Sequence, residues 1–274
     1  MSYKDTYHSL KVILTDKTFF IFNPKIGSRF MESLFDKPGV EFQFKNGNFS
    51  EVTSQRNGEI TATYLKSVMA EWELIVTSKS KKDIVILYRD PLKRFITALT
   101  QDIFSGNIPS ISRYLVRAYF SSMGFTLPQI KNFYQNITLD DKFLAKQDDL
   151  KVFDTMCTLL IDAFIKGLTD VPVHSTHFTP HNPLIVQMLI SNKIDLNKVK
   201  IFNIDDGKNE LEDYLEKNEI DISNTGRQPN SSHIKNLIKN YVESSDSYII
   251  PAILSSEVDS FRMLNMLKIQ METK

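Results

Sequence analysis

The chain has 274 residues, of which 42% are hydrophobic, which suits one large domain or two small ones with a sizeable core. Lys plus Arg and Asp plus Glu both number 33, so the net charge is zero and nothing favours broad electrostatic capture of nucleic acid or a membrane. Because the net charge is zero, any anion site must be local. The single cysteine, Cys157, excludes an internal disulfide and is expected in the core.

The first informative stretch is residues 18–35, TFFIFNPKIGSRFMESLF. Its apolar run at 19–22 predicts a buried strand, and apolar residues then recur at helical spacing. Between them lies a turn with Lys25 and Gly27, followed by helix amides that have no partner inside the helix. These amides, the helix dipole and Lys25 favour a phosphate or sulfate there, although an ordinary surface turn uses the same residue types. The turn is not a Walker A loop, because its lysine precedes the glycine.

Two weaker patterns follow this helix. Residues 37–58 are rich in Gly, Asn, Lys and Phe without a clear period, which predicts a long loop or short irregular strands where an acceptor could bind. Residues 59–74 carry a roughly helical apolar stripe.

The second informative stretch is the apolar run 84–88, typical of a central strand in a parallel sheet. It ends at Arg89, after which Asp90 suits the N-cap and Pro91 the first position of a helix. Ligands of open α/β sheets bind at the carboxyl ends of strands, so Lys25 and Arg89 could face one bis-anionic ligand. The alternative is a structural arginine paired with a carboxylate.

The middle of the chain is predicted to be helical. Thr97, about two turns into the helix after Arg89, could bond a phosphate oxygen or its own helix backbone. Further helical spacing covers 110–122, 128–137 and 150–167.

A loop at 170–181 gathers His174, His177 and His181. A metal site is one interpretation, but no Cys or acidic pair lies nearby in the sequence and zinc would need a distant fourth ligand. A histidine near a nucleotide could instead act as a general base.

The last third continues the alternation of strands and helices that favours a parallel sheet. Residues 199–204 predict a third strand, which ends in Asp205-Asp206. Residues 224–232 form a polar loop with a single cation, Arg227, and 255–268 predict a final amphipathic helix.

Taken together and in this order, these pieces resemble the sulfotransferases that use 3′-phosphoadenosine 5′-phosphosulfate, especially the carbohydrate-modifying, Golgi-type branch. Residues 22–28, FNPKIGS, match the 5′-phosphosulfate loop, and 89–97, RDPLKRFIT, match the 3′-phosphate segment. HFTP at 177–180 is a further landmark, while 201–206, Gly226-Arg227 and the final helix fit more loosely. The resemblance covers most of the chain.

The resemblance implies an α/β, P-loop-like three-layer fold with a central, mostly parallel sheet flanked by helices, in a single domain over 1–274. It also implies metal-independent transfer of a sulfuryl group to a hydroxyl or amine of a carbohydrate or another small acceptor. Lys25 would stabilise charge on the bridging oxygen, and His177, favoured over Glu59, would be the base.

Donor binding is also assigned by the resemblance. Arg89 and Thr97 would hold the 3′-phosphate, with Thr97 standing where the family usually has serine, and Arg227 could add a contact. The implied loop residues are Lys25, Ile26, Gly27, Ser28 and Arg29. Besides Thr97, two other positions depart from the family: Arg29 replaces a small or hydroxylated residue, and His181 stands where glutamine is frequent.

The exported, membrane-anchored start of the Golgi enzymes is missing from the chain. We therefore expect a bacterial or virus-encoded relative that works in a cytoplasm, unless an N-terminal anchor has been removed. No nucleic-acid or membrane partner is expected, and the sequence does not predict an oligomeric state.

Two other functions remain open. A nucleotide-dependent phosphotransferase would need a magnesium-holding acidic pair, for which Asp205-Asp206 is the candidate. A non-catalytic protein of the same fold could bind a nucleotide or a glycan.

Overall fold

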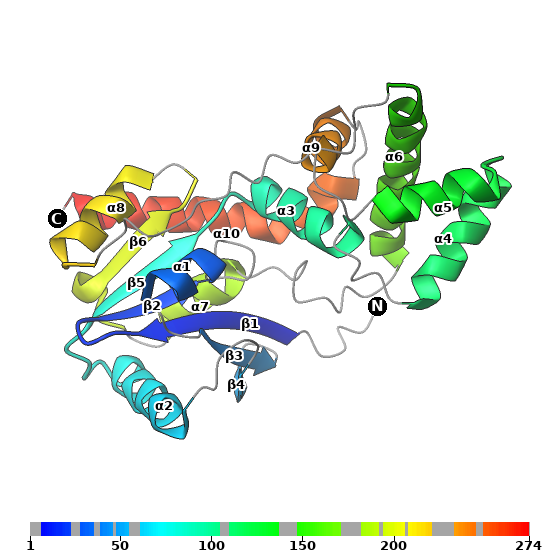
Figure 1. The fold of residues 1–274 in the computed structure, drawn as a ribbon. Helices are drawn as coiled ribbons and strands as arrows, with labels where there is room; N and C mark the ends of the chain where they lie inside the picture. The colour runs from blue at the N-terminus through cyan, green and yellow to red at the C-terminus, as the bar shows by residue number, and fades with distance from the viewer. Residues whose placement is uncertain are drawn as a thin grey trace. The chain divides into compact units, whose positions relative to one another are not determined.

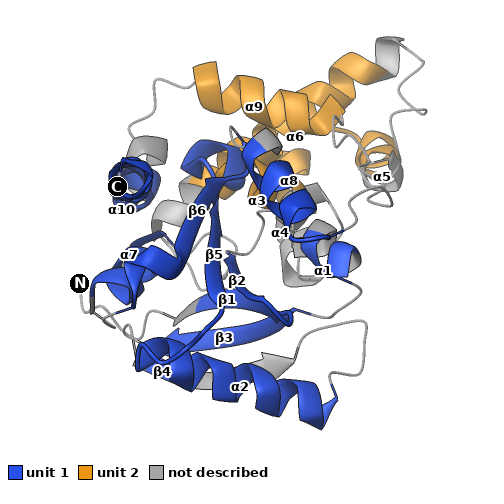
Figure 2. Cartoon of the chain, turned by 90° about the vertical axis from the view of Figure 1, so that its left-hand side faces the viewer, with its two compact units in different colours: residues 1–94, 173–227, 254–274 blue, residues 95–172, 228–253 orange. Residues whose placement is uncertain are grey.

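The computed structural model describes residues 7–22, 28–35, 39–45, 48–54, 61–104, 110–136, 147–170, 182–191, 194–205, 208–220, 233–244 and 249–273. The chain divides into two compact units, one of residues 1–94, 173–227 and 254–274 and the other of residues 95–172 and 228–253 (Figure 2). The single domain over 1–274 stays a prediction.

The first unit is built on a six-stranded mixed sheet with the order β4-β3-β1-β2-β5-β6 (Figure 1). Its strands are β1 (Tyr7–Leu14), β2 (Thr18–Phe22), β3 (Val40–Lys45), β4 (Asn48–Ser54), β5 (Asp83–Tyr88) and β6 (Val199–Asn203). β5 pairs in parallel with both β2 and β6, whereas β1, β3 and β4 pair antiparallel. The three predicted strands therefore form the parallel part of the sheet, as expected.

The antiparallel part corrects the sequence prediction. Residues 7–14 were not predicted as a strand, and much of 37–58, predicted as a loop or short irregular strands, forms the regular pair β3 and β4. Val40, Phe42 and Phe44 alternate with polar residues and are buried on one face. Such alternation is typical of antiparallel strands rather than of the continuous apolar runs that mark β2 and β5.

The described helices are distributed over both units. They are α1 (Ser28–Phe35), α2 (Ala62–Val76), α3 (Pro91–Phe104), α4 (Ser110–Ser122), α5 (Leu127–Asn136), α6 (Gln147–Asp170), α7 (Asn182–Ser191), α8 (Lys208–Lys217), α9 (His233–Ser244) and α10 (Ile249–Glu272), with a short 3-10 helix at Leu196–Lys198. The helices predicted at 110–122, 128–137 and 150–167 are thus confirmed with small shifts at their ends, and the one predicted at 255–268 is confirmed but extends further in both directions, over Ile249–Glu272. None of the helices among the described residues is both long and apolar enough to cross a membrane.

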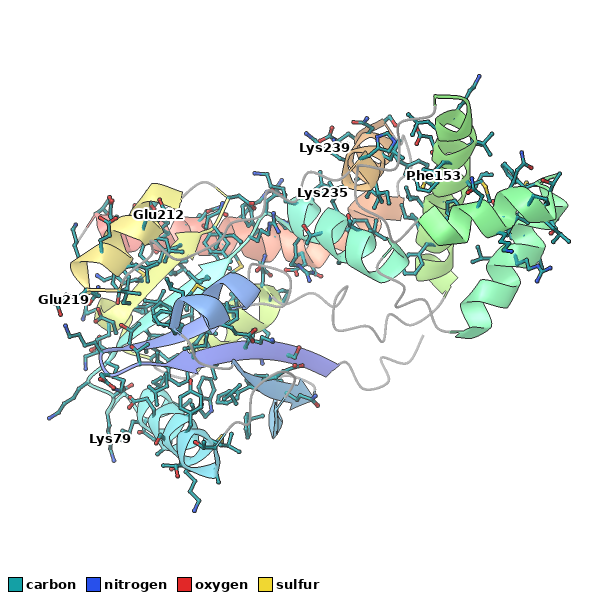
Figure 3. The ribbon with its side chains drawn as sticks, viewed as in Figure 1. Lys79, Phe153, Glu212, Glu219, Lys235 and Lys239 are labelled. Carbon is teal, nitrogen blue, oxygen red and sulfur yellow. The ribbon has the colours of Figure 1, made fainter. Side chains whose placement is uncertain are left out.

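Successive strand residues point to opposite faces of the sheet, so the apolar strands have two faces to bury. Helices pack against both of these faces. On one face the strands pack against α2, α7 and α10 through residues such as Trp72, Ile185 and Leu264. On the other, Phe20 and Phe22 of β2 pack in a second cluster that includes residues of α1 and α8. Side chains fill the space on both sides of the strands (Figure 3). The first unit therefore has three layers, as predicted.

The second unit is helical and has its own aromatic core. The rings of Phe120 and Phe133 lie 5.2 Å apart, and those of Phe133 and Phe153 lie 5.4 Å apart. Cys157 is fully buried, and burial raises the pKa of its thiol, which confirms core packing and disfavours a thiolate nucleophile.

Two side-chain pairs join α6 to α9 in the second unit. Asp154 lies 2.7 Å from a ring nitrogen of His233, and the Tyr241 hydroxyl donates to Asp162 at 2.5 Å. The members of each pair recur after eight residues along both helices, about two helical turns. The pairs therefore fix the sliding register of the two helices.

Candidate functional site

The candidate site lies at the carboxyl edge of the parallel strands. Phe22, the last residue of β2, is in register with Leu87 of β5, and Tyr88 is in register with Asn203 of β6. The three strands therefore end together, and the two motif segments follow neighbouring strands at one sheet edge. α1 and α3 begin shortly after β2 and β5.

Arg89 is the first residue after β5 and forms an ion pair at this edge. Its Nε donates to Oδ1 of Asp205 at 3.2 Å, and the backbone N–H of Asp90 donates to the other carboxylate oxygen at 3.1 Å. The side chains of Arg89 and Asp205 are 17% and 9% exposed. The alternative of an arginine paired with a carboxylate is thus confirmed as a contact, and the 3′-phosphate role stays a prediction.

Asp205 is itself held by the strand ends. It lies two residues beyond β6, and its own N–H donates to the side-chain oxygen of Asn203 at 3.1 Å. The preceding N–H, from Ile204, donates to the carbonyl of Tyr88 at 3.0 Å and continues the pairing of β5 with β6. Lys93 Nζ lies 4.0 Å from the Asp205 carboxylate. The position of this carboxylate therefore follows from strand pairing.

The start of α3 is capped as the sequence predicts. Asp90 accepts the backbone N–H of Lys93 on its side chain at 2.9 Å, and Pro91 is the first helical residue. An aspartate N-cap satisfies an amide that has no partner inside the helix, and Pro is well suited to the first position. Arg89 is consequently fixed between the end of β5 and a capped helix.

A second ion pair lies behind the start of α3, and sequence analysis missed it. Arg94 Nη2 donates to Glu257 Oε1 at 2.6 Å, and the other Glu257 oxygen accepts the backbone N–H of Asn182 at 2.9 Å. Burial lowers the pKa of Arg94, which the carboxylate of Glu257 opposes. The available signal was an acidic residue on the apolar stripe of the final helix, between Leu254 and Leu264.

The remaining predicted site residues are not brought together with Arg89 by any described contact. Thr97 lies in α3 within the second unit, and Ser28 and Arg29 begin α1, where only the backbone is described. Outside the described residues lie Lys25, Ile26, Gly27, Glu59, His177 and Arg227.

Some of the candidate metal ligands lie among the residues that the structure describes, and others do not. Among the residues that the structure describes, no group of three or more His, Cys, Asp or Glu could hold a metal ion. The three histidines of 170–181 and Asp206 of the candidate magnesium pair lie outside that part of the chain.

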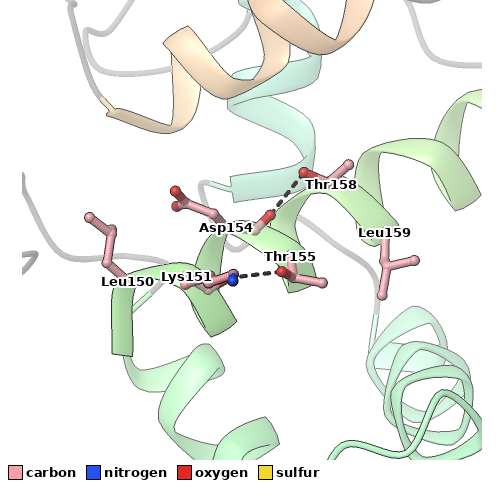
Figure 4. A pocket seen from close by; sticks show the side chains of 6 residues that line it. All are labelled: Leu150, Lys151, Asp154, Thr155, Thr158 and Leu159. Atoms are coloured by element: carbon pink, nitrogen blue, oxygen red, sulfur yellow. Dashed lines mark hydrogen bonds between the residues drawn. The ribbon is translucent and has the colours of Figure 1, made fainter. Parts of the chain in front are cut away.

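A depression of about 610 Å³ lies on the second unit, and the described residues that line it belong to α6 (Figure 4). The hydroxyls of Thr155 and Thr158 point along the helix and donate to the carbonyls of Lys151 and Asp154. No predicted site residue that the structure describes lines this depression. Since both hydroxyls donate to backbone carbonyls of α6 itself, we propose no functional site there.

Among the described residues at the strand edge, the named charges cancel. Arg89 and Lys93 are cations, while Asp90 and Asp205 are carboxylates. These described residues would therefore hold an anion through directed N–H donors of the guanidinium and of helix starts rather than through a net positive charge of their own.

Comparisons with protein-family models, with curated proteins and with solved structures found no match to this chain.

Proposed function

We propose that this protein is a sulfotransferase that moves the sulfuryl group of 3′-phosphoadenosine 5′-phosphosulfate to a hydroxyl or amine of an acceptor, a carbohydrate or another small hydroxyl compound. One observation supports it above the others. The stretches FNPKIGS and RDPLKRFIT follow neighbouring parallel strands, β2 and β5, which end in register at one sheet edge.

This arrangement suits a donor with two anionic groups. Neighbouring strands lie about 5 Å apart, so ligand groups on adjacent turns can belong to one nucleotide. In the proposal, Lys25, which follows β2 in the sequence, and the start of α1 would bind one anion, and Arg89, the first residue after β5, would bind the other. Arg89 is partly buried and oriented by Asp205, which suits selective recognition of a phosphate.

The chemistry assigned to the chain needs an acid-base pair of residues rather than a covalent intermediate. His177 takes the proton from the acceptor hydroxyl as its oxygen bonds to sulfur. Lys25 donates to the bridging oxygen as its bond to sulfur breaks, which stabilises the charge that develops there. The donor supplies the sulfuryl group and leaves as adenosine 3′,5′-bisphosphate.

The proposal also includes a P-loop-like class for the α/β fold, a single domain and work in a cytoplasm. The P-loop-like class, the single domain and the carbohydrate acceptor rest on the resemblance of the two motifs to the Golgi-type branch, whereas work in a cytoplasm departs from that branch. The α/β sheet flanked by helices is the part that the structure provides.

Calorimetric titration tests the proposal against its competitors. The protein is titrated with adenosine 3′,5′-bisphosphate without magnesium and, separately, with ATP and magnesium. We expect binding of the bisphosphate without metal. Binding of ATP with magnesium alone would favour the phosphotransferase, and absence of binding for both ligands would contradict the proposal.

A further inference from the structure

We propose that Asp205 is the positioning residue that orients the Arg89 guanidinium for the 3′-phosphate of the donor. This role rests on the proposed sulfotransferase function. It would make Asp205 part of the donor site through Arg89, without contact between its carboxylate and the nucleotide.

The two oxygens of Asp205 have separate directional partners. One accepts from Arg89 Nε at 3.2 Å, and the other accepts from the Asp90 backbone N–H at 3.1 Å. A carboxylate whose two oxygens both accept hydrogen bonds has a defined orientation. Its hydrogen bond with Arg89 Nε in turn restricts the orientation of the guanidinium plane. Because a guanidinium is a rigid fork, fixing Nε also fixes the directions of its terminal nitrogens.

Such fixing has an energetic reason. An arginine side chain has many rotamers, and ordering one at a binding site carries an entropic cost that lowers affinity by up to about tenfold. If Asp205 orders Arg89 before the ligand arrives, this cost does not reduce the affinity for the phosphate. Loss of the Asp205 carboxylate should therefore weaken phosphate binding by up to about tenfold.

The opposite role for Asp205, a displaceable internal anion, fits the contacts less well. Its backbone N–H is bonded to Asn203, and its carboxylate is only 9% exposed. Displacement would also leave the Asp90 N–H without its acceptor. Asp205 is thus a fixed part of the strand edge, and the two roles predict changes of opposite sign when the carboxylate is removed.

The test is a double-mutant cycle read by calorimetric binding of adenosine 3′,5′-bisphosphate and of 5′-AMP. The proteins are the wild type, Asp205→Ala, Arg89→Ala and the double variant. We expect Asp205→Ala to weaken the bisphosphate about tenfold and 5′-AMP by less than about twofold. In the Arg89→Ala background the same change should have almost no effect.

Two further variants guard the interpretation. Asp205→Asn keeps the shape and one acceptor oxygen and should restore part of the lost affinity, and it replaces Asp205→Ala in the cycle if that variant does not fold. Asp259→Ala removes an exposed carboxylate paired with Arg262 and should change neither affinity.

The outcomes separate the two proposals. Tighter bisphosphate binding by Asp205→Ala, equal losses for both ligands, or additive losses in the double variant would overturn the positioning role while leaving the sulfotransferase intact. A wild-type protein that does not bind the bisphosphate would overturn the sulfotransferase proposal and this role with it.

Discussion

Arg94 and Glu257 form an ion pair that is buried on both sides, with 3% and 1% of their side chains exposed and 2.6 Å between Nη2 and Oε1. The same carboxylate accepts the first backbone N–H of α7. Glu257 of α10 thereby joins the start of α3 to the start of α7, the helix that follows the segment carrying His177.

Glu257→Ala is expected to destabilise the protein strongly. Removing one partner leaves a buried guanidinium and a helix-terminal amide without their acceptor, which costs about 3–5 kcal/mol. The free energy of unfolding is measured by urea titration, with Asp259→Ala as the matched control at an exposed ion pair of the same helix. A loss for Glu257→Ala as small as that of the control would show that the pair does not stabilise the fold.

Arg89→Ala is expected to lower the affinity for adenosine 3′,5′-bisphosphate much more than that for 5′-AMP. A charged hydrogen bond contributes about 1.5–3 kcal/mol, so the loss should be roughly 10- to 100-fold. Calorimetry of both ligands measures it, and Arg262→Ala, an exposed arginine of α10, is the control. Equal losses for the two nucleotides would remove the 3′-phosphate from the role of Arg89.

The stability of the protein should fall at high pH through Tyr214. Burial is the main cause that raises the pKa of Tyr214 to about 12, from an ordinary value of 10.0; its hydroxyl lies 3.2 Å from Asp83 and from Thr18. Above about pH 10 the unfolded state loses the phenolic proton first, so the free energy of unfolding decreases until about pH 12.

Tyr214→Phe lacks this titration and isolates it from other ionising groups. Urea unfolding of both proteins at about pH 8 and about pH 11 should give a stability advantage of the wild type that shrinks at the higher pH. An advantage that stays constant or grows would contradict the raised pKa.

Local sequence patterns predicted the parallel half of the sheet and its helices well. The runs 19–22 and 84–88 are continuously apolar because strands covered on both faces bury every residue, and such runs are easily recognised. Asp90 and Pro91 likewise mark the start of α3 by residue type alone. Residues 7–14 lack such a run, because Lys11 interrupts the apolar residues of β1. Lys11 forms an ion pair with Glu32, which is distant in the sequence.

Local sequence patterns could not predict ion-pair partners that are far apart in the sequence. Asp205 lies 116 residues from Arg89, and the two meet because β5 pairs with β6. The sequence left open whether a phosphate or a carboxylate faces Arg89, since both can accept the same pair of hydrogen bonds from a guanidinium. Glu257, 163 residues from Arg94, was missed for the same reason.

Transfer of a radiolabelled sulfuryl group from 3′-phosphoadenosine 5′-phosphosulfate to a panel of mono- and oligosaccharides tests the central claim most directly. The wild type should label an acceptor and release one adenosine 3′,5′-bisphosphate for each label transferred. Lys25→Ala should remain folded and lose transfer, because the bridging oxygen loses its stabilising cation. Equal turnover by Lys25→Ala would contradict the mechanism, and a wild type that binds the bisphosphate but labels no acceptor in the panel would contradict carbohydrate sulfation.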